Sequence, residues 1–160
     1  MPPKKLKRIK SDSAVQRGIE KSVREQLVEI LKWHGTIEPR RISYGAAVME
    51  FDCYGESDGT VLLAEINAHH GSLKAAQRNK VLRDIFKMYA QSAEEYEKAG
   101  VTSVRMVIVF TNADASKFLD GRSWAAEAAR KFAVESVVVP LKAAEIKALQ
   151  KTQKDQDLRN

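Results

Sequence analysis

The chain has 160 residues, of which 44% are hydrophobic and 30% are charged, a composition typical of one soluble globular domain with a single core. Its one cysteine, Cys53, excludes an internal disulfide framework and favours a reducing, cytoplasmic setting. No apolar run approaches the roughly 18 residues of a membrane span, so no membrane partner is expected.

The net charge of +6 is distributed unevenly along the chain. Residues 1–10 have no acid and contribute +5, residues 142–160 contribute +2, and the body between them sums to −1. The bases of the first segment are Lys4, Lys5, Lys7, Arg8 and Lys10. This segment is either a solvated tail or an arm that binds nucleic-acid phosphates in a salt-dependent way.

The elements follow from apolar spacing and turn residues. In chain order we expect a helix at about 14–33, strands at 36–45, 46–53 and 61–68 with a turn at 54–60, a helix at 72–99, a buried strand at 104–111, a helix at 122–133, a strand at 136–140 and a helix at 141–154. This order predicts an α/β fold in which helices flank a mixed sheet. The expected organisation is a disordered basic arm over 1–12, one domain over 13–154 and a polar tail over 155–160.

Acidic side chains gather on the predicted hairpin. Strict alternation places Glu50 and Asp52 on one face of the first strand, and it places Phe51 with Cys53 on the other. Glu65 interrupts the otherwise apolar strand VLLAEINA and lies opposite Glu50 or Asp52, depending on the register. Opposed carboxylates destabilise a hairpin unless a cation lies between them, and oxygen ligands of this kind suit Mg²⁺. The alternative is an exposed acidic face without a ligand.

The order of elements and the spacing of these acids resemble the PD-(D/E)xK nuclease superfamily, with its restriction-endonuclease-like αβββαβ core. The resemblance covers residues 14–111 and leaves an additional C-terminal αβα. The family places one acid on the first helix, one on a hairpin strand and one at the start of a (D/E)xK triplet on the next strand. The resemblance implies that these acids are Glu20, Asp52 (with Glu50 as its substitute) and Glu65. The stretch AHHGSLKAAQRNKVLRD is also similar to a small group of bacterial proteins.

One position departs from the family pattern, because the third residue of the triplet is Asn67 rather than lysine. In the family this lysine positions the attacking water and stabilises negative charge at phosphorus. The helix that follows supplies Lys74, Gln77 and Lys80, and Gln77 matches the family's common glutamine. We expect Lys74 to reach back to the site, and we expect Lys80 to lie too far along the helix.

The resemblance implies a metal-dependent nuclease that hydrolyses DNA phosphodiester bonds. Asp52 and Glu65 would hold Mg²⁺ (or Mn²⁺), Glu20 would assist, and Lys74 or Gln77 would position water or phosphate. The alternatives are a catalytically inactive nucleic-acid-binding domain, for which Asn67 is the main argument, and a protein-interaction domain. RNA in place of DNA and a homodimer are further options at this point.

Overall fold

The computed structural model describes the backbone of residues 3–158 and the side chains of residues 13–158. Its elements are α1 (Pro3–Leu31), β1 (Glu38–Tyr44), β2 (Ala47–Ser57), β3 (Thr60–Asn67), α2 (Ala75–Tyr96), β4 (Ser103–Phe110), α3 (Ala113–Asp120), α4 (Trp124–Lys131), β5 (Val134–Val138) and α5 (Ala143–Asp157). Every predicted element is present, and the short helix α3 is an addition. No helix in this described part is long and apolar enough to cross a membrane.

The five strands form one sheet in the order β1-β2-β3-β4-β5. β1, β2 and β3 are antiparallel to one another, whereas β4 pairs parallel with β3 and β5 parallel with β4. The crossover from β3 to β4 runs through α2, which is the usual way of joining parallel neighbours. The prediction of a mixed sheet flanked by helices is therefore confirmed.

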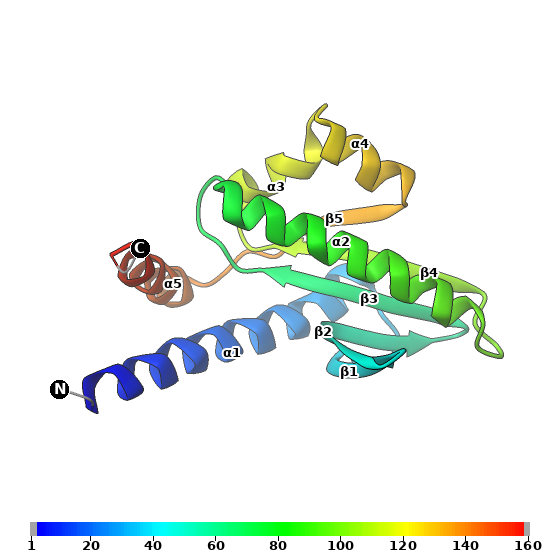
Figure 1. Ribbon diagram of the computed structural model, residues 1–160, viewed down its shortest axis with the longest axis horizontal. Coiled ribbons are helices and arrows are strands. Elements are labelled where there is room, and N and C mark those ends of the chain that lie inside the picture. Colours follow the sequence, from blue (N-terminus) through cyan, green and yellow to red (C-terminus); the bar gives the residue numbers. More distant parts are fainter. Residues whose placement is uncertain (1–2, 159–160) are drawn as a thin grey trace.

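Two apolar cores lie on opposite faces of the sheet (Figure 1). On one face α2, α3 and α4 cover the sheet, and Val81 and Met88 of α2 are fully buried there. On the other face α1 and α5 pack, with Val23 and Leu27 of α1 fully buried. β3 contributes alternately to both cores, so the central strand is apolar along almost its whole length.

Several element boundaries differ from the prediction. Helix α1 begins at Pro3 rather than near residue 14, so residues 3–12 continue this helix instead of preceding it. Helix α5 extends to Asp157, three residues into the predicted polar tail. Helix α3 was not among the predicted elements, and it begins where the Asn112 side chain accepts a hydrogen bond from Asp114 N at 2.9 Å.

The connection between β2 and β3 is shorter than the predicted turn. β2 continues to Ser57, and only Asp58 and Gly59 form the loop. Both have positive φ, at 49° and 78°, the conformation of the two-residue Asp-Gly hairpin turn. A Cβ on Gly59 would lie 2.9 Å from Gly100 O, so glycine is required there for space as well as for backbone conformation. This tight turn fixes the register of the hairpin.

Candidate active site

The register of the hairpin brings two carboxylates together. The backbone pairs run from Ser57↔Thr60 to Cys53↔Ala64, and the residues adjacent to the last pair are Asp52 on β2 and Glu65 on β3. Asp52 Oδ2 also accepts a hydrogen bond from Ile66 N at 2.9 Å, which ties this side chain to β3. Of the two predicted partners for Glu65, the structure therefore selects Asp52.

A β-bulge separates Glu50 from this pair. The register between β1 and β2 shifts between the pairs Glu38↔Tyr54 and Arg40↔Phe51. As a result Phe51 and Cys53 join cores on opposite faces, so the prediction that they share a face was wrong. Bulges interrupt strict alternation in this way and redirect the side chain at the irregularity.

Glu50 lies on the far side of this bulge and faces away from the pair. Its carboxylate is exposed and forms an ion pair of 3.1 Å with Arg41 on β1. It makes no ion pair with the bases of α2, although Lys87 of that helix donates to its backbone oxygen at 2.6 Å. Glu50 therefore does not take part in the carboxylate pair.

Glu65 is a buried acid with a basic partner. Only 3% of the residue is exposed, and its Oε1 lies 2.5 Å from Lys87 Nζ of α2. Burial and the nearby Asp52 carboxylate nonetheless raise the pKa of Glu65 to about 8, against the opposing effect of Lys87. The side chain thus occupies a position where a second cation would be stabilising.

Glu20 joins the group from helix α1, on the other face of the sheet. It is half-buried, and its pKa is raised by burial and by the Asp52 carboxylate. Arg24, one turn further along α1, donates to the backbone oxygen of Asp52 at 3.1 Å. The predicted helix acid is therefore close enough to Asp52 to interact with it, whereas Glu25 and Glu29 are exposed, as expected.

Lys80 supplies a positive charge beside the acids. It forms an ion pair of 2.9 Å with Asp84, one turn further along α2. Burial alone would lower the pKa of Lys80, but Asp84, Asp52 and Glu65 together raise it above its usual value. The charges of Asp52 and Glu65 thus act on Lys80, which the sequence had ranked below Lys74 as the lysine of the site.

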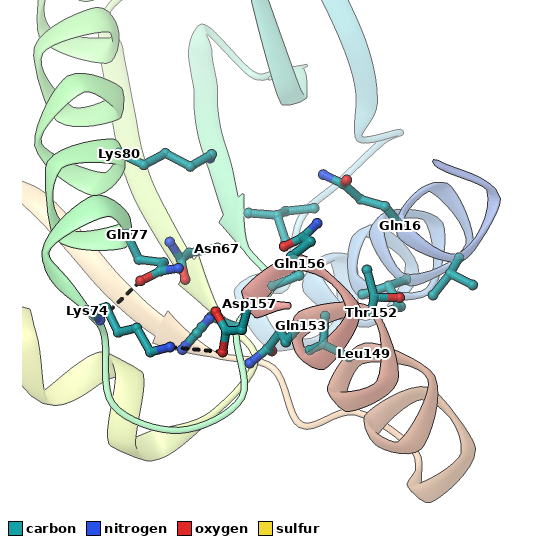
Figure 2. A pocket seen from close by; sticks show the side chains of 15 residues that line it. Gln16, Asn67, Lys74, Gln77, Lys80, Leu149, Thr152, Gln153, Gln156 and Asp157 are labelled. Atoms are coloured by element: carbon teal, nitrogen blue, oxygen red, sulfur yellow. Dashed lines mark hydrogen bonds and ion pairs between the residues drawn. The ribbon is translucent and has the colours of Figure 1, made fainter. Parts of the chain in front are cut away.

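Lys74 lies elsewhere. It precedes the first residue of α2, and its Nζ forms an ion pair of 3.0 Å with Asp157 of α5 (Figure 2). Gln77 Oε1 accepts from Lys74 N at 3.1 Å, so this glutamine closes the first turn of α2. The expectation that Lys74 reaches back to the acids is not met in the structure, although Lys74 and Gln77 both border the pocket described below.

Sequence reasoning overlooked Asp84 and Lys87. With Gln77 and Lys80 they occur at spacings of three and four residues along α2, which is the spacing of a face directed at the core. Asp84 is 9% exposed and Lys87 is partly buried. A polar stripe at core spacing was the signal available, because such residues are buried only where they have partners.

The basic residues predicted to bind nucleic acid have side chains outside the described part of the structure. These are Lys4, Lys5, Lys7, Arg8 and Lys10. Among the described side chains there is no group of three or more His, Cys, Asp or Glu residues placed to hold a metal ion. The candidate metal ligands are thus the pair Asp52 and Glu65, and a pair suits Mg²⁺, which keeps several of its water ligands.

No protein-family model, no curated protein and no solved structure matches this chain.

Proposed function

We propose that this chain is a divalent-metal-dependent nuclease that hydrolyses DNA phosphodiester bonds. The observation that carries the proposal is that Asp52 Oδ2 accepts a hydrogen bond from Ile66 N, next to the buried Glu65, so that two carboxylates lie close together on β2 and β3. The same two carboxylates raise the pKa of Lys80 on α2. The succession α1, β1, β2, β3, α2, β4 supports it, because a restriction-endonuclease-like core has the same order. A buried carboxylate facing a second one is costly to fold, so it calls for a functional reason.

The donor set fits a hard divalent ion. Asp52 and Glu65 would hold Mg²⁺ or Mn²⁺ through carboxylate oxygens, and Glu20 would orient its water ligands. When bound, such an ion polarises the phosphate and lowers the pKa of a bound water. The hydrogen bond from Ile66 N fixes one oxygen of Asp52, so the carboxylate is held in one orientation before any ligand arrives.

Lys80 takes the role that the family assigns to the triplet lysine. Because neighbouring acids hold it protonated, its ammonium group can donate to a phosphate oxygen and stabilise the negative charge that develops there. Asn67 offers an amide at the triplet position and contributes no charge. The positive charge thus comes from α2 rather than from β3.

A catalytically inactive nucleic-acid-binding domain is the second candidate. The ion pair between Lys87 and Glu65 favours it, because Lys87 already compensates the charge for which a metal would otherwise compete. A protein-interaction domain is the third, favoured by the exposed aromatic side chains of Phe86 and Trp124. Neither candidate would cleave DNA, and the protein-interaction domain would not bind it either.

Cleavage of plasmid and single-stranded DNA in Mg²⁺ or Mn²⁺ tests the proposal. The test variant is Glu65→Gln, and the matched control is Glu50→Gln, the exposed glutamate of the same hairpin. We expect Glu65→Gln to reduce cleavage at least 100-fold, whereas Glu50→Gln remains within about threefold of the wild type. Equal cleavage by the wild type and Glu65→Gln, or none by either, would reject the nuclease.

A further inference from the structure

A pocket of about 210 Å³ lies at the end of β3 (Figure 2). Its walls come from α1, from the end of β3, from the start of α2 and from α5. Asn67, two residues beyond Glu65 on β3, and Lys80 of α2 are among the lining residues. A cavity of this volume accommodates one nucleobase. Its position at the end of β3 places it next to the proposed site of hydrolysis.

Asn67 gives this pocket an unmatched hydrogen-bonding group. The residue is only 5% exposed, and its Oδ1 has no hydrogen-bond partner within the described residues. A buried amide oxygen without a partner is costly, so it marks a place where a ligand donor is favourable. Asn67 borders the pocket, and it lies two residues beyond Glu65 on the same face of β3, about 6.6 Å along the strand.

The lining combines amides with an apolar wall. Gln16, Gln77, Gln153 and Gln156 come from three different helices, while Ile19 and Leu149 supply buried apolar surface. A side-chain amide offers a donor and an acceptor side by side, which matches the edge of a nucleobase. An apolar wall suits the flat face of the same ring system.

Three of these glutamines already have partners, and one does not. Gln77 accepts from Lys74 N, Gln153 accepts from His70 N at 2.9 Å, and Gln16 donates to Glu20. Across residues 13–158, the side chain of Gln156 makes no hydrogen bond. The buried Oδ1 of Asn67 and the whole amide of Gln156 are therefore without partners among the described residues, and Figure 2 shows both residues at the pocket.

We propose that this pocket binds one unpaired nucleotide of the substrate, with its base between Asn67 and Gln156 and its phosphate toward Asp52 and Glu65. This rests on the proposed function and narrows it to single strands, overhangs or extruded bases. We expect a duplex to bind less tightly, because α5 forms one wall of the pocket. The amides make the base contacts, while Lys80 faces the phosphate.

Binding is measured with a fluorescein-labelled 12-nucleotide DNA in EDTA, as a single strand and as a blunt duplex. We expect the single strand to bind at least tenfold more tightly. Gln156→Ala and Asn67→Ala should each weaken single-strand binding about three- to tenfold. Gln150→Ala, an exposed glutamine on the same helix that does not border the pocket, should bind as the wild type does. An RNA 12-mer tells which sugar the pocket accepts.

Equal affinity for the single strand and the duplex would overturn the pocket assignment, and so would unchanged binding by Gln156→Ala. Gln156 is exposed, so this variant remains informative even if Asn67→Ala fails to fold. Cleavage assays on the same oligonucleotides separate the two proposals. Selective single-strand binding without cleavage retains the pocket and rejects the nuclease, whereas cleavage without strand preference retains the nuclease and rejects the pocket.

Discussion

The Lys87 ammonium group lies 2.5 Å from Glu65 Oε1, yet it does not bring the pKa of that carboxyl down to its usual range. Lys87 also donates to the backbone oxygen of Glu50 and lies 4.9 Å from the centre of the Phe51 ring, so its charge is shared among several partners. Asp52 and Asp84 add negative charge around Glu65. The native state therefore binds a proton at Glu65 more tightly than the unfolded chain does.

This difference predicts a pH-dependent stability. The stabilisation from protonated Glu65 is complete below about pH 4.5 and is lost as the pH rises to about 8. In EDTA, the free energy of unfolding of the wild type should fall by a few kcal/mol over this range. Urea denaturation of Glu65→Gln should give a flatter pH profile, with Glu50→Gln retaining the wild-type slope. Parallel profiles for Glu65→Gln and the wild type would contradict the raised pKa.

Metal binding should stabilise the protein. For a dissociation constant of about 1 mM, 10 mM Mg²⁺ contributes about 1.4 kcal/mol, or roughly 3–5 °C in Tm at pH 8. Asp52→Asn should lose this increase, because it removes one of the two carboxylates, whereas Glu50→Gln should retain it. Differential scanning calorimetry checks the shift. A similar increase in Asp52→Asn would assign the metal to other ligands.

The two helix lysines should differ in their effect on catalysis. Lys80→Gln should lower kcat by about 100- to 1000-fold, because it removes the positive charge beside the acids. Lys74→Gln should change kcat by less than about threefold, because Lys74 is paired with Asp157 at the surface. Single-turnover cleavage of a labelled oligonucleotide measures both, and Lys80→Arg should recover part of the rate. The reverse ranking would restore Lys74 to the site.

The tight turn between β2 and β3 should be sensitive to any side chain at position 59. Gly59→Ala places a Cβ at 2.9 Å from Gly100 O at a positive φ, so we expect a loss of about 2–4 kcal/mol in stability. Gly45→Ala is the matched control, because Gly45 also has a positive φ but nothing within 4 Å of its Cβ position. It should cost about 1 kcal/mol. Equal losses in urea denaturation would mean that the close approach to Gly100 is unimportant.

The basic segment should determine the salt dependence of binding. Replacing Lys4, Lys5, Lys7, Arg8 and Lys10 by glutamine removes five charges. If each contacts a phosphate, the slope of log K against log salt for a single strand becomes shallower by about 3.5. Fluorescence anisotropy from 50 to 300 mM NaCl measures the slope. An unchanged slope would identify the segment as a solvated tail.

Much of the fold was predictable because local signals agreed with the tertiary structure. The apolar stretch of β4 and the alternation of β3 identified the central strands, and Gly100 marked the end of the region of α2. The Asp-Gly pair identified a turn, but its length was overestimated because Tyr54 to Ser57 also have turn-compatible residue types. Since the length of the loop sets the register, the choice between Glu50 and Asp52 needed the structure.

The acidic residues of the candidate site could be predicted from the sequence, whereas its basic residues could not. Glu65 stood out because a carboxylate interrupts an apolar strand, and that signal is local. The choice of Lys80 over Lys74 depends on where α2 begins and on the direction of each side chain. Asp52 lies where strict alternation breaks, and no alternation rule predicts a bulge of this kind.

The pocket has walls that come from opposite ends of the described chain, because α1 lines one side and α5 another. The two helices pack on the same face of the sheet, but the whole sheet separates them in sequence. A proteolytic fragment that ends before Lys142 would retain every strand and both facing carboxylates while losing one side of the chamber. Cleavage of the chain between β5 and α5 would therefore leave the pocket open on the side that α5 lines.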